Sequence, residues 1–346
     1  MKFRDRVGGL PGAVAAFPKL LSLRVHNRPG NSVTLQSKFM SLLVVGSVAY
    51  DGIETPYGKV DRILGGAATY IALSSSFFTK PRIVAVVGDD FDAADEQLLA
   101  DRGIDLEGLE RVPGKCFFWQ GVYSADMNSR TTLRTDLNVF AGFEPKVPES
   151  YRQTPFLMLG NIQPSLQGHV RSQMTALRTV GGDTMDFWIN DFRDELLATI
   201  AGWDFLLIND SEARALSGET NLRKAAERIH AMGPKWVIIK RGEFGAILFE
   251  QGQGHFVAPG YLLDQVMDPT GAGDCFAGGF FGFLAENQEK LGAGPIPSRI
   301  LRQAVIYGSV MGSFCCEQFG PERFKTLTRA EIDARFQQFS EFTSFV

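Results

Sequence analysis

Short apolar runs that alternate with helical segments constrain the fold of this chain more than any other feature. Most of these runs are continuous in Leu, Ile, Val and Phe, as expected for strands buried on both faces of a parallel sheet. The predicted strands cover residues 41–48, 82–87, 156–159, 182–186, 205–208 and 236–240. The predicted helices cover residues 65–78, 95–102, 222–232 and 302–317. Repeated strand–helix units predict a parallel sheet with helices on its faces.

Two segments break this pattern and predict hairpins. Residues 116–123 alternate with period two, with Phe117, Trp119 and Tyr123 on one side, and residues 130–138 can return as a partner strand after a polar turn. Residues 246–249 and 255–258 predict the second hairpin. From the residues alone, the first hairpin is either an ordinary sheet edge or a small sheet that covers a ligand.

Composition limits the class of protein. The chain has 346 residues, of which 45% are hydrophobic, so it can bury a large core. No apolar run approaches the roughly 20 residues that span a bilayer, and a net charge of −4 without a basic stripe argues against nucleic-acid binding. The four cysteines include no C-x-x-C pair, so free thiols in a reducing cytoplasm are expected.

Residues 1–39 differ from the rest of the chain. They carry seven Lys or Arg against one acidic residue, Asp5, and prolines interrupt any long helix. An organelle transit peptide has this basic character. The interpretation we favour is that Met40 is the true start, and that residues 1–39 form a disordered or untranslated extension.

The segment D-P-T-G-A-G-D, from Asp268 to Asp274, carries the chemistry. Gly271 and Gly273 allow the backbone to turn tightly and to approach a ligand closely. A helix that begins here directs free N–H groups and the positive end of its dipole at an anion. Asp274 then stands where a carboxylate can take a proton from an alcohol. The alternative is a plain helix start with Asp as a capping residue.

This segment resembles the C-terminal signature of the PfkB (ribokinase-like) kinases of sugars and nucleosides. The resemblance implies a ribokinase-like three-layer α/β/α sandwich, with a mainly parallel central sheet and a small β-sheet lid. It covers residues 41 to about 330 and predicts a kinase domain at 40–346, with lid elements near 51–64 and 115–140. It implies that Asp274 is the catalytic base and that the amides around Gly271, Ala272 and Gly273 form the anion hole.

Two further motifs support a nucleotide site. Asn209 and Glu212 match the N-x-x-E motif of the family, which orders water and Mg²⁺ near the phosphates, although Asn209 could also simply cap a helix. Gly242 and Gly245 match the family's G-x-x-G turn at the ATP phosphates and ribose, and Lys240 could add positive charge there. A bare hairpin turn and a solvated lysine are the alternatives.

The substrate side is predicted by three positions. Asp51 lies shortly after the first strand, where ligands of open α/β sheets bind, and the resemblance makes it the substrate carboxylate. Gly65 and Gly66 resemble the family's N-terminal glycine pair. Ala67 and Tyr70 replace the lysine and asparagine of the ribokinase form, which argues against ribose itself.

Asp268 and Thr270 match a monovalent-cation position, which predicts K⁺, although Asp268 could also simply brace the loop. Tyr70 could offer a stacking surface, but the apolar helix around it favours a place in the core.

These observations predict an ATP- and Mg²⁺-dependent, cytoplasmic kinase that phosphorylates a hydroxyl group of a small sugar or polyol. An adenosine-type nucleoside kinase is the first alternative, because the aromatic hairpin could stack on a base. A catalytically inactive sugar or nucleotide sensor is the second. A dehydrogenase is disfavoured, because no G-x-G-x-x-G follows the first strand. A homodimer through the lid sheet is also predicted.

Overall fold

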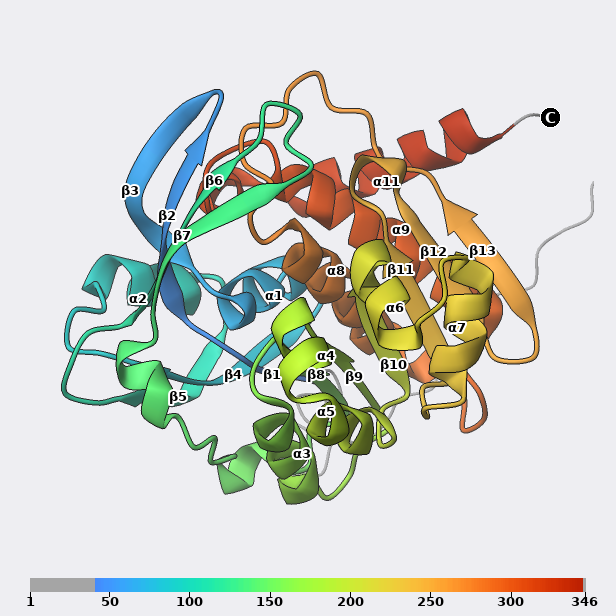
Figure 1. The fold of residues 1–346 in the computed structure, drawn as a ribbon, viewed down its shortest axis with the longest axis horizontal. Coiled ribbons are helices and arrows are strands. Elements are labelled where there is room, and N and C mark those ends of the chain that lie inside the picture. Colours follow the sequence, from blue (N-terminus) through green and yellow to red (C-terminus); the bar gives the residue numbers. More distant parts are fainter. Residues whose placement is uncertain (1–40, 345–346) are drawn as a thin grey trace, which may run out of the picture. The chain divides into compact units, whose positions relative to one another are not determined.

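The computed structural model describes residues 41–344, and its centre is a nine-stranded sheet (Figure 1). Every neighbouring pair of strands is parallel except those that involve β12, which is antiparallel to both of its neighbours. In spatial order the strands are β13 (Gly254–Ala258), β12 (Ala246–Glu250), β11 (Trp236–Lys240), β10 (Phe205–Asn209), β9 (Thr179–Asp183), β8 (Phe156–Leu159), β1 (Ser41–Val45), β4 (Lys80–Val87) and β5 (Asp105–Arg111). The predicted N-terminal extension and the Met40 start lie outside the described residues.

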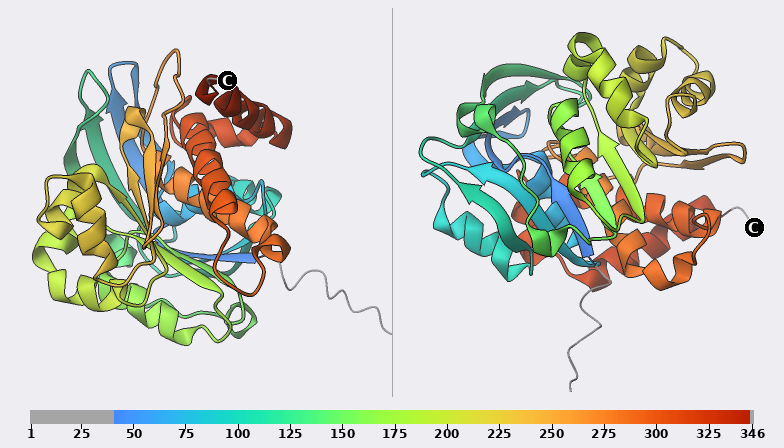
Figure 2. Two further views of the ribbon diagram at one scale, coloured as in Figure 1. Left: turned by 90° about the vertical axis from the view of Figure 1, so that its right-hand side faces the viewer. Right: turned by 90° about the horizontal axis from the view of Figure 1, so that it is seen from below.

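Helices cover both faces of the sheet, and each face has its own hydrophobic core (Figure 2). One core includes residues of α1 (Ala67–Ser75), α2 (Ala93–Asp101), α8 (Ala272–Glu286), α9 (Ser298–Cys315), α10 (Glu322–Thr326) and α11 (Arg329–Thr343). The other includes residues of α3 (Pro164–Gln173), α4 (Asp186–Asp191), α5 (Arg193–Ile200), α6 (Asp210–Ser217) and α7 (Leu222–His230). The predicted three-layer sandwich is therefore confirmed.

Strand β1 shows why the apolar runs are continuous. Leu42 and Val44 belong to the first core, and Leu43 and Val45 belong to the second. Successive side chains of a strand point to opposite faces, so a strand covered on both sides needs apolar residues at every position.

Strand β9 corrects the sequence prediction. The predicted strand covers residues 182–186, but β9 ends at Asp183, and α4 begins at Asp186. A Cβ atom on Gly181 would lie 2.4 Å from the ring of Phe281, and one on Gly182 would lie 2.3 Å from the ring of Trp203. These glycines leave room for large rings from the two cores. Glycine has a low strand propensity, so the sequence gives only a weak signal for a strand at these positions.

Other element bounds also differ from the prediction. The helix predicted over residues 65–78 is shorter, because Gly65 is the last residue of β3 and α1 begins at Ala67. Strand β5 was not predicted, and helices α3, α4 and α5 were expected only as helices without bounds between the strands. The burial pattern of β5 is mixed rather than continuous, so its sequence lacks an apolar run. Short, weakly apolar helices such as α3 have no clear helical stripe.

A separate four-stranded sheet forms the lid elements that the resemblance predicts. Its order is β3 (Gly58–Gly65), β2 (Ala49–Thr55), β6 (Phe117–Tyr123) and β7 (Arg130–Asp136). Strands β2 and β6 are parallel, and the two outer pairs are antiparallel hairpins. The aromatic hairpin is therefore not an edge of the central sheet.

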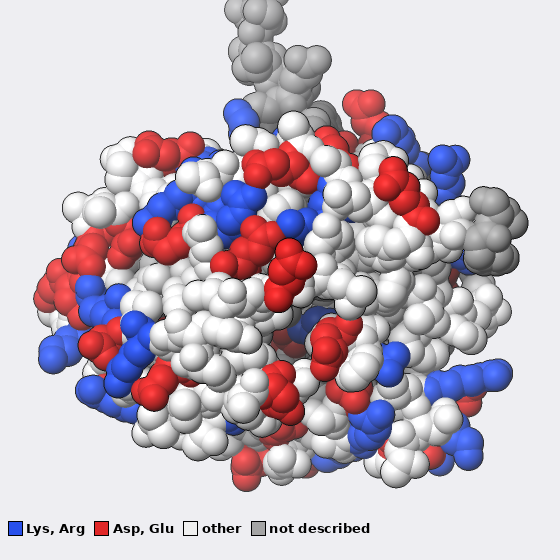
Figure 3. All heavy atoms as spheres, turned by 90° about the horizontal axis from the view of Figure 1, so that it is seen from above, with Lys and Arg blue, Asp and Glu red and all other residues white. Residues whose placement is uncertain are grey.

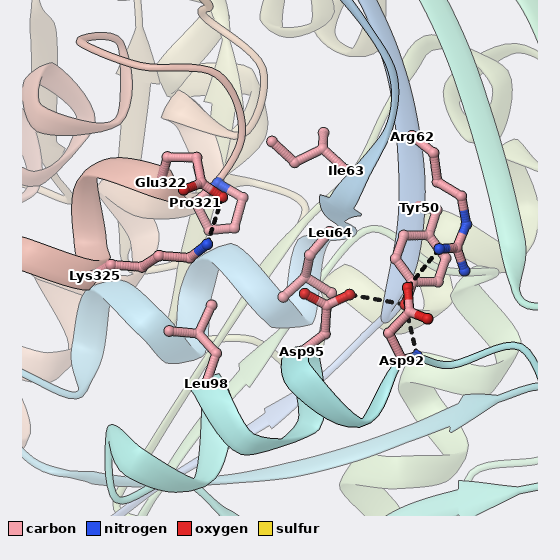
Figure 4. A pocket seen from close by; sticks show the side chains of 10 residues that line it. All are labelled: Tyr50, Arg62, Ile63, Leu64, Asp92, Asp95, Leu98, Pro321, Glu322 and Lys325. Carbon is pink, nitrogen blue, oxygen red and sulfur yellow. Dashed lines mark hydrogen bonds and ion pairs between the residues drawn. The ribbon is translucent and has the colours of Figure 1, made fainter.

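Tyr50, near the start of β2, fixes this small sheet to the central domain. Its hydroxyl donates to Asp95 Oδ2 at 2.8 Å and accepts from the Asp92 amide at 2.9 Å, and the Arg62 guanidinium lies 3.4 Å from the centre of its ring. These residues line a polar cavity between β2, β3, α2 and α10 (Figure 4). Tyr50 precedes Asp51 in β2, so the anchor on one face of the strand fixes the carboxylate on the other.

Acidic and basic side chains are interspersed over the face shown in Figure 3. Within residues 41–344, no helix combines the length and apolar character that crossing a bilayer requires.

Candidate active site

The predicted site residues come together at the carboxyl ends of the parallel strands. Asp183, Asn209 and Lys240 end the neighbouring strands β9, β10 and β11, and α8 begins beside them (Figure 1). The lid sheet lies across the same edge, because Tyr123 of β6 contacts Thr270. Open α/β sheets bind ligands at this edge.

Gly271 forms the turn into α8. Its φ of +76° is left-handed, and a Cβ atom there would lie 2.5 Å from the ring of Tyr70. Tyr70 is 1% exposed, so the prediction that it lies in the core is confirmed. The ring supports the turn from below, and the free amides at the start of α8 form a cradle suited to an anion.

Replacing Gly271 with Ala is expected to lower the free energy of unfolding by about 2–4 kcal/mol, because left-handed strain adds to an overpacked ring. Urea unfolding measures this change. Gly103→Ala is the matched control: Gly103 also has a left-handed φ, +72°, but a Cβ atom there would meet nothing within 4 Å. Equal losses of stability in the two variants would show that the Tyr70 contact does not restrict the turn.

Asp274 lies in the first turn of α8 and is partly buried. The pKa of Asp274 is raised to about 7, first by burial and then by the charge of Asp183, while Lys240 and Arg130 act in the opposite direction. A carboxyl group with this pKa can accept a proton near neutral pH.

Lys240 and Asp183 form an ion pair behind the cradle. Lys240 Nζ lies 3.2 Å from Asp183 Oδ2, and both side chains are largely buried. A Cβ atom on Gly273 would lie 3.1 Å from Nζ, so the ammonium group faces the cradle directly. Burial favours the neutral amine, but Asp183, Glu212 and Asp274 outweigh it and hold the pKa of Lys240 above its usual value.

Asp51 stands on the lid side of the site and is 5% exposed. Its pKa is raised to about 8, first by burial and then by the charges of Asp268 and Asp274. The amide of Gly66 acts in the opposite direction by hydrogen bonding. Gly65 has to be glycine, because a Cβ atom there would lie 2.0 Å from Asp51 Oδ2. Gly65 therefore makes room for the carboxylate, whereas Gly66 makes room for the backbone of Ser47, whose carbonyl oxygen would lie 2.5 Å from a Cβ atom there.

Asn209 and Glu212 form the capping box of α6. Asn209 Oδ1 accepts from the Glu212 amide at 2.8 Å, and Glu212 Oε2 accepts from the Asn209 amide at 2.9 Å. The predicted capping role of Asn209 is confirmed. Burial, followed by the charge of Asp183, raises the pKa of Glu212 to about 7, so this carboxyl group belongs to the same electrostatic cluster.

Gly242 and Gly245 form the turn between β11 and β12. Both have positive φ, +54° and +84°, and a Cβ atom on Gly245 would lie 2.1 Å from the carbonyl oxygen of Ala258. Glu243, between them, accepts a hydrogen bond from Asn128 at the tip of the lid hairpin, at 3.0 Å. The turn is thus in contact with the lid.

Asp268 braces the loop before α8. Its Oδ1 accepts from the Thr270 amide at 2.9 Å, and its Oδ2 accepts from the Gly320 amide at 3.0 Å. The Thr270 hydroxyl lies 3.0 Å from the Tyr123 hydroxyl. These contacts account for both residues as supports of the cradle.

Two charged residues of the site were not predicted. Asp183 was assigned to a strand interior, and only the true end of β9 places it at the site. Arg130 begins β7 and acts on Asp51 and Asp274 from the lid. Neither lies in a local motif, and the only signal was the place of Arg130 at the start of a predicted strand.

Comparisons with known proteins agree with this arrangement. The sequence profile described as pfkB family carbohydrate kinase matches residues 40–326. The chain is 29% identical to the cytidine kinase of Thermococcus kodakarensis over 248 residues, which cover 70% of this chain and 87% of the relative.

Two solved structures share the fold. The nucleoside kinase of Burkholderia thailandensis in complex with inosine has a TM-score of 0.66 and 23% identity, and the match covers 86% of this chain and 96% of that one. The ribokinase of Arabidopsis thaliana complexed with ribose and ATP has a TM-score of 0.66 and 21% identity, covering 86% and 98%. The fold, the extent of the profile match and the site together show that this chain belongs to the pfkB family of carbohydrate kinases.

Proposed function

We propose that this kinase transfers the γ-phosphoryl group of ATP to a hydroxyl group of a small sugar, polyol or nucleoside. The observation that carries the proposal is Asp274. Its carboxyl group lies in the first turn of α8, shortly after a left-handed glycine, has a pKa near neutrality, and is near enough to Asp51 for its charge to raise the pKa of Asp51. The acceptor hydroxyl would lie between the two carboxyl groups.

Each residue then has a defined task. Asp274 takes the proton from the acceptor hydroxyl. The amides around Gly271, Ala272 and Gly273, together with Lys240, stabilise negative charge where the phosphoryl group is transferred. Asp51 holds other hydroxyl groups of the acceptor through charge-assisted hydrogen bonds. The lid keeps water away from the reacting groups.

The nucleotide side of the site fits ATP and Mg²⁺. Gly273 has no side chain and faces the Lys240 ammonium group, and Gly242 is exposed, so phosphates can approach both backbones. Within residues 41–344, no three His, Cys, Asp or Glu side chains are arranged as a metal cage. Glu212 and Asn209 would hold Mg²⁺ through water, and Mg²⁺ commonly keeps several waters and uses substrate phosphates as ligands. When bound, the ion neutralises charge on the phosphate oxygens.

Potassium and dimerisation remain proposals. The bracing hydrogen bonds of Asp268 leave lone pairs on its carboxylate, so we retain K⁺ as a cation near Asp268 and Thr270. Equal activity in K⁺ and Na⁺ buffers would rule out this role.

A dimer through the lid sheet is tested by size-exclusion chromatography with light scattering, where a monomer mass would exclude it.

The test of the proposed reaction is ADP release coupled to a spectroscopic assay, with ATP, Mg²⁺ and a panel of acceptors. The panel contains ribose, fructose, inositol, cytidine, adenosine and inosine. We expect acceptor-dependent ADP release from wild-type protein. The sensor alternative predicts ATP or acceptor binding without acceptor-dependent ADP release.

The pH profile of kcat/KM is expected to rise at least tenfold per pH unit below pH 7, to rise less steeply between pH 7 and 8, and to level off near pH 9. Asp274 has to be ionised to accept a proton, and its raised pKa of about 7 places the bend in the profile. Asp51, with a pKa of about 8, extends the rise because its ionised form binds hydroxyl groups more strongly. Initial rates between pH 5.5 and 9 measure the profile. A flat profile between pH 6 and 8 would contradict the assignment.

A further inference from the structure

The lid sheet has two faces with different surroundings. In the parallel pair of β2 and β6, Asp51 is in register with Trp119, and Tyr50 is in register with Phe118. Residues in register point to the same face of a sheet, so Trp119 shares the face of Asp51, and Phe118 shares the face of Tyr50. Tyr50 points to Asp92 and Asp95 (Figure 4), and successive residues of a strand point to opposite faces, so Asp51 points the other way. Trp119 therefore lies on the face that covers the active site.

The rest of that face confirms the direction. Strand β6 is regular, so Gly121 and Tyr123 follow Trp119 on the same side, and Tyr123 contacts Thr270. Arg130 is in register with Tyr123 and acts on Asp51 and Asp274. The one register shift in the β6–β7 pair leaves an extra residue in β7 and does not change the alternation in β6.

The indole ring is held in one place on this face. A Cβ atom on Gly121 would lie 2.3 Å from Trp119 Cη2 and 2.5 Å from Cζ2, so the ring occupies the space above the glycine. Its Nε1–H donates to Thr132 Oγ1 at 3.3 Å, and the Arg130 guanidinium lies 5.7 Å from the ring centre. The ring therefore lies over the sheet at Gly121, and the Arg130 guanidinium lies over the ring.

The hydrophobic core does not account for this ring. Trp119 is only partly buried and belongs to neither core, whereas Phe118, on the opposite face, packs against the first core. Among the described residues, no aromatic ring is paired with Trp119. This partly exposed ring contacts Thr132 through its hydrogen bond and lies under the Arg130 guanidinium, and it shares a sheet face with the carboxylate that we propose holds the sugar hydroxyls.

We infer that the acceptor is a nucleoside, with its ribose held by Asp51 and its base stacked on the indole of Trp119. Asp51 and Trp119 are paired on the neighbouring strands β2 and β6, and neighbouring strands lie about 4.8 Å apart. The two side chains are therefore close enough for one nucleoside to place its ribose at Asp51 and its base at Trp119. Every base has a π-face that stacks on an aromatic side chain, and Arg130 adds a cation beside it. This inference rests on the proposed phosphotransfer and names its substrate class.

The experiment compares kcat/KM for cytidine, uridine, adenosine and inosine with that for free ribose and fructose, using wild-type protein, Trp119→Ala and Trp119→Phe. We expect the best nucleoside to exceed free ribose by roughly 10- to 100-fold, because a free sugar lacks the stack. Trp119→Ala should remove roughly that factor, mainly through KM, and Trp119→Phe should restore part of it. Phe118→Leu, on the opposite face, is the matched control and should leave the nucleoside-to-ribose ratio as in wild type.

The outcomes separate the two proposals. The substrate class would be overturned if kcat/KM were equal for nucleosides and free sugars, or if Trp119→Ala lowered kcat/KM for both by the same factor. The proposed phosphotransfer would still stand in either case. No acceptor-dependent ADP release from any compound would instead overturn the phosphotransfer. Calorimetric titration of the same nucleosides and of ribose decides the class without turnover: nucleoside binding weakened by Trp119→Ala supports it, and ribose binding of equal strength contradicts it.

Discussion

Asp274→Asn is expected to lower kcat by about 10²- to 10⁴-fold for whichever acceptor the enzyme uses, the usual contribution of a positioned general base. Asn keeps the shape of the side chain but cannot accept the proton from the hydroxyl group. KM should change little, because we propose that Asp51 and the lid, and not Asp274, hold the acceptor. The coupled ADP assay measures both constants.

The same variant should be at least as stable as the wild type at pH 8. The folded-state pKa of Asp274, about 7, lies above the usual value of 3.8. Its contribution to stability is therefore fully present below about pH 4 and is lost as pH rises through 7. Above pH 7 the wild type retains a buried charge that Asn lacks. Melting temperatures at pH 5 and pH 8 test this sign, and a larger advantage at pH 5 than at pH 8 would contradict it.

Asp101→Asn is the matched control for this substitution, because Asp101 is an exposed acid at the end of α2, away from the site. It should keep wild-type turnover. Turnover by Asp274→Asn within a few-fold of that control would mean that another group accepts the proton.

Lys240→Met is expected to lower both stability and turnover. The substitution leaves Asp183 buried without its partner, and removing one member of a buried ion pair costs about 3–5 kcal/mol. It also removes the cation that faces the cradle, and removing one group that stabilises a transition state typically costs about 10²- to 10³-fold in kcat. Urea unfolding and the ADP assay measure the two effects separately.

The double variant Asp183→Asn/Lys240→Met separates structure from chemistry. With both charges removed, the stability should return most of the way to wild type, because no unpaired charge is left buried. Turnover should stay low, because the cation is still missing. Recovery of turnover together with stability would show that Lys240 only balances Asp183 and does not act on the phosphates.

Local features of this chain could be predicted because their causes lie within a few residues. The capping box of Asn209 and Glu212 is formed by residues three positions apart, and the glycines before Asp274 are needed for the turn in which they stand. The same holds for the continuous runs of β1, since a strand covered on both faces has to be apolar at each position.

Contacts between distant segments could not be predicted in this way. Lys240 and Asp183 are 57 residues apart, and Tyr123 and Thr270 are 147 apart. Their meeting depends on which strands are neighbours and in what register. The wrong bounds predicted for β9 have this cause. Its glycines suggest a break in the strand, and only the tertiary structure shows that they leave room for the rings of Phe281 and Trp203.

The sequence by itself thus determined the alternating α/β architecture and the glycine turn that leads into the helix of Asp274, the residue that we propose as proton acceptor, because each depends on backbone preferences within a short segment. Only the tertiary structure decided the environment of that acceptor. It added Asp183, Arg130 and the ion pair with Lys240, and it placed Trp119 on the same face as Asp51. Strand order and register bring these side chains together, and burial at their meeting point raises the pKa of Asp274 toward neutrality.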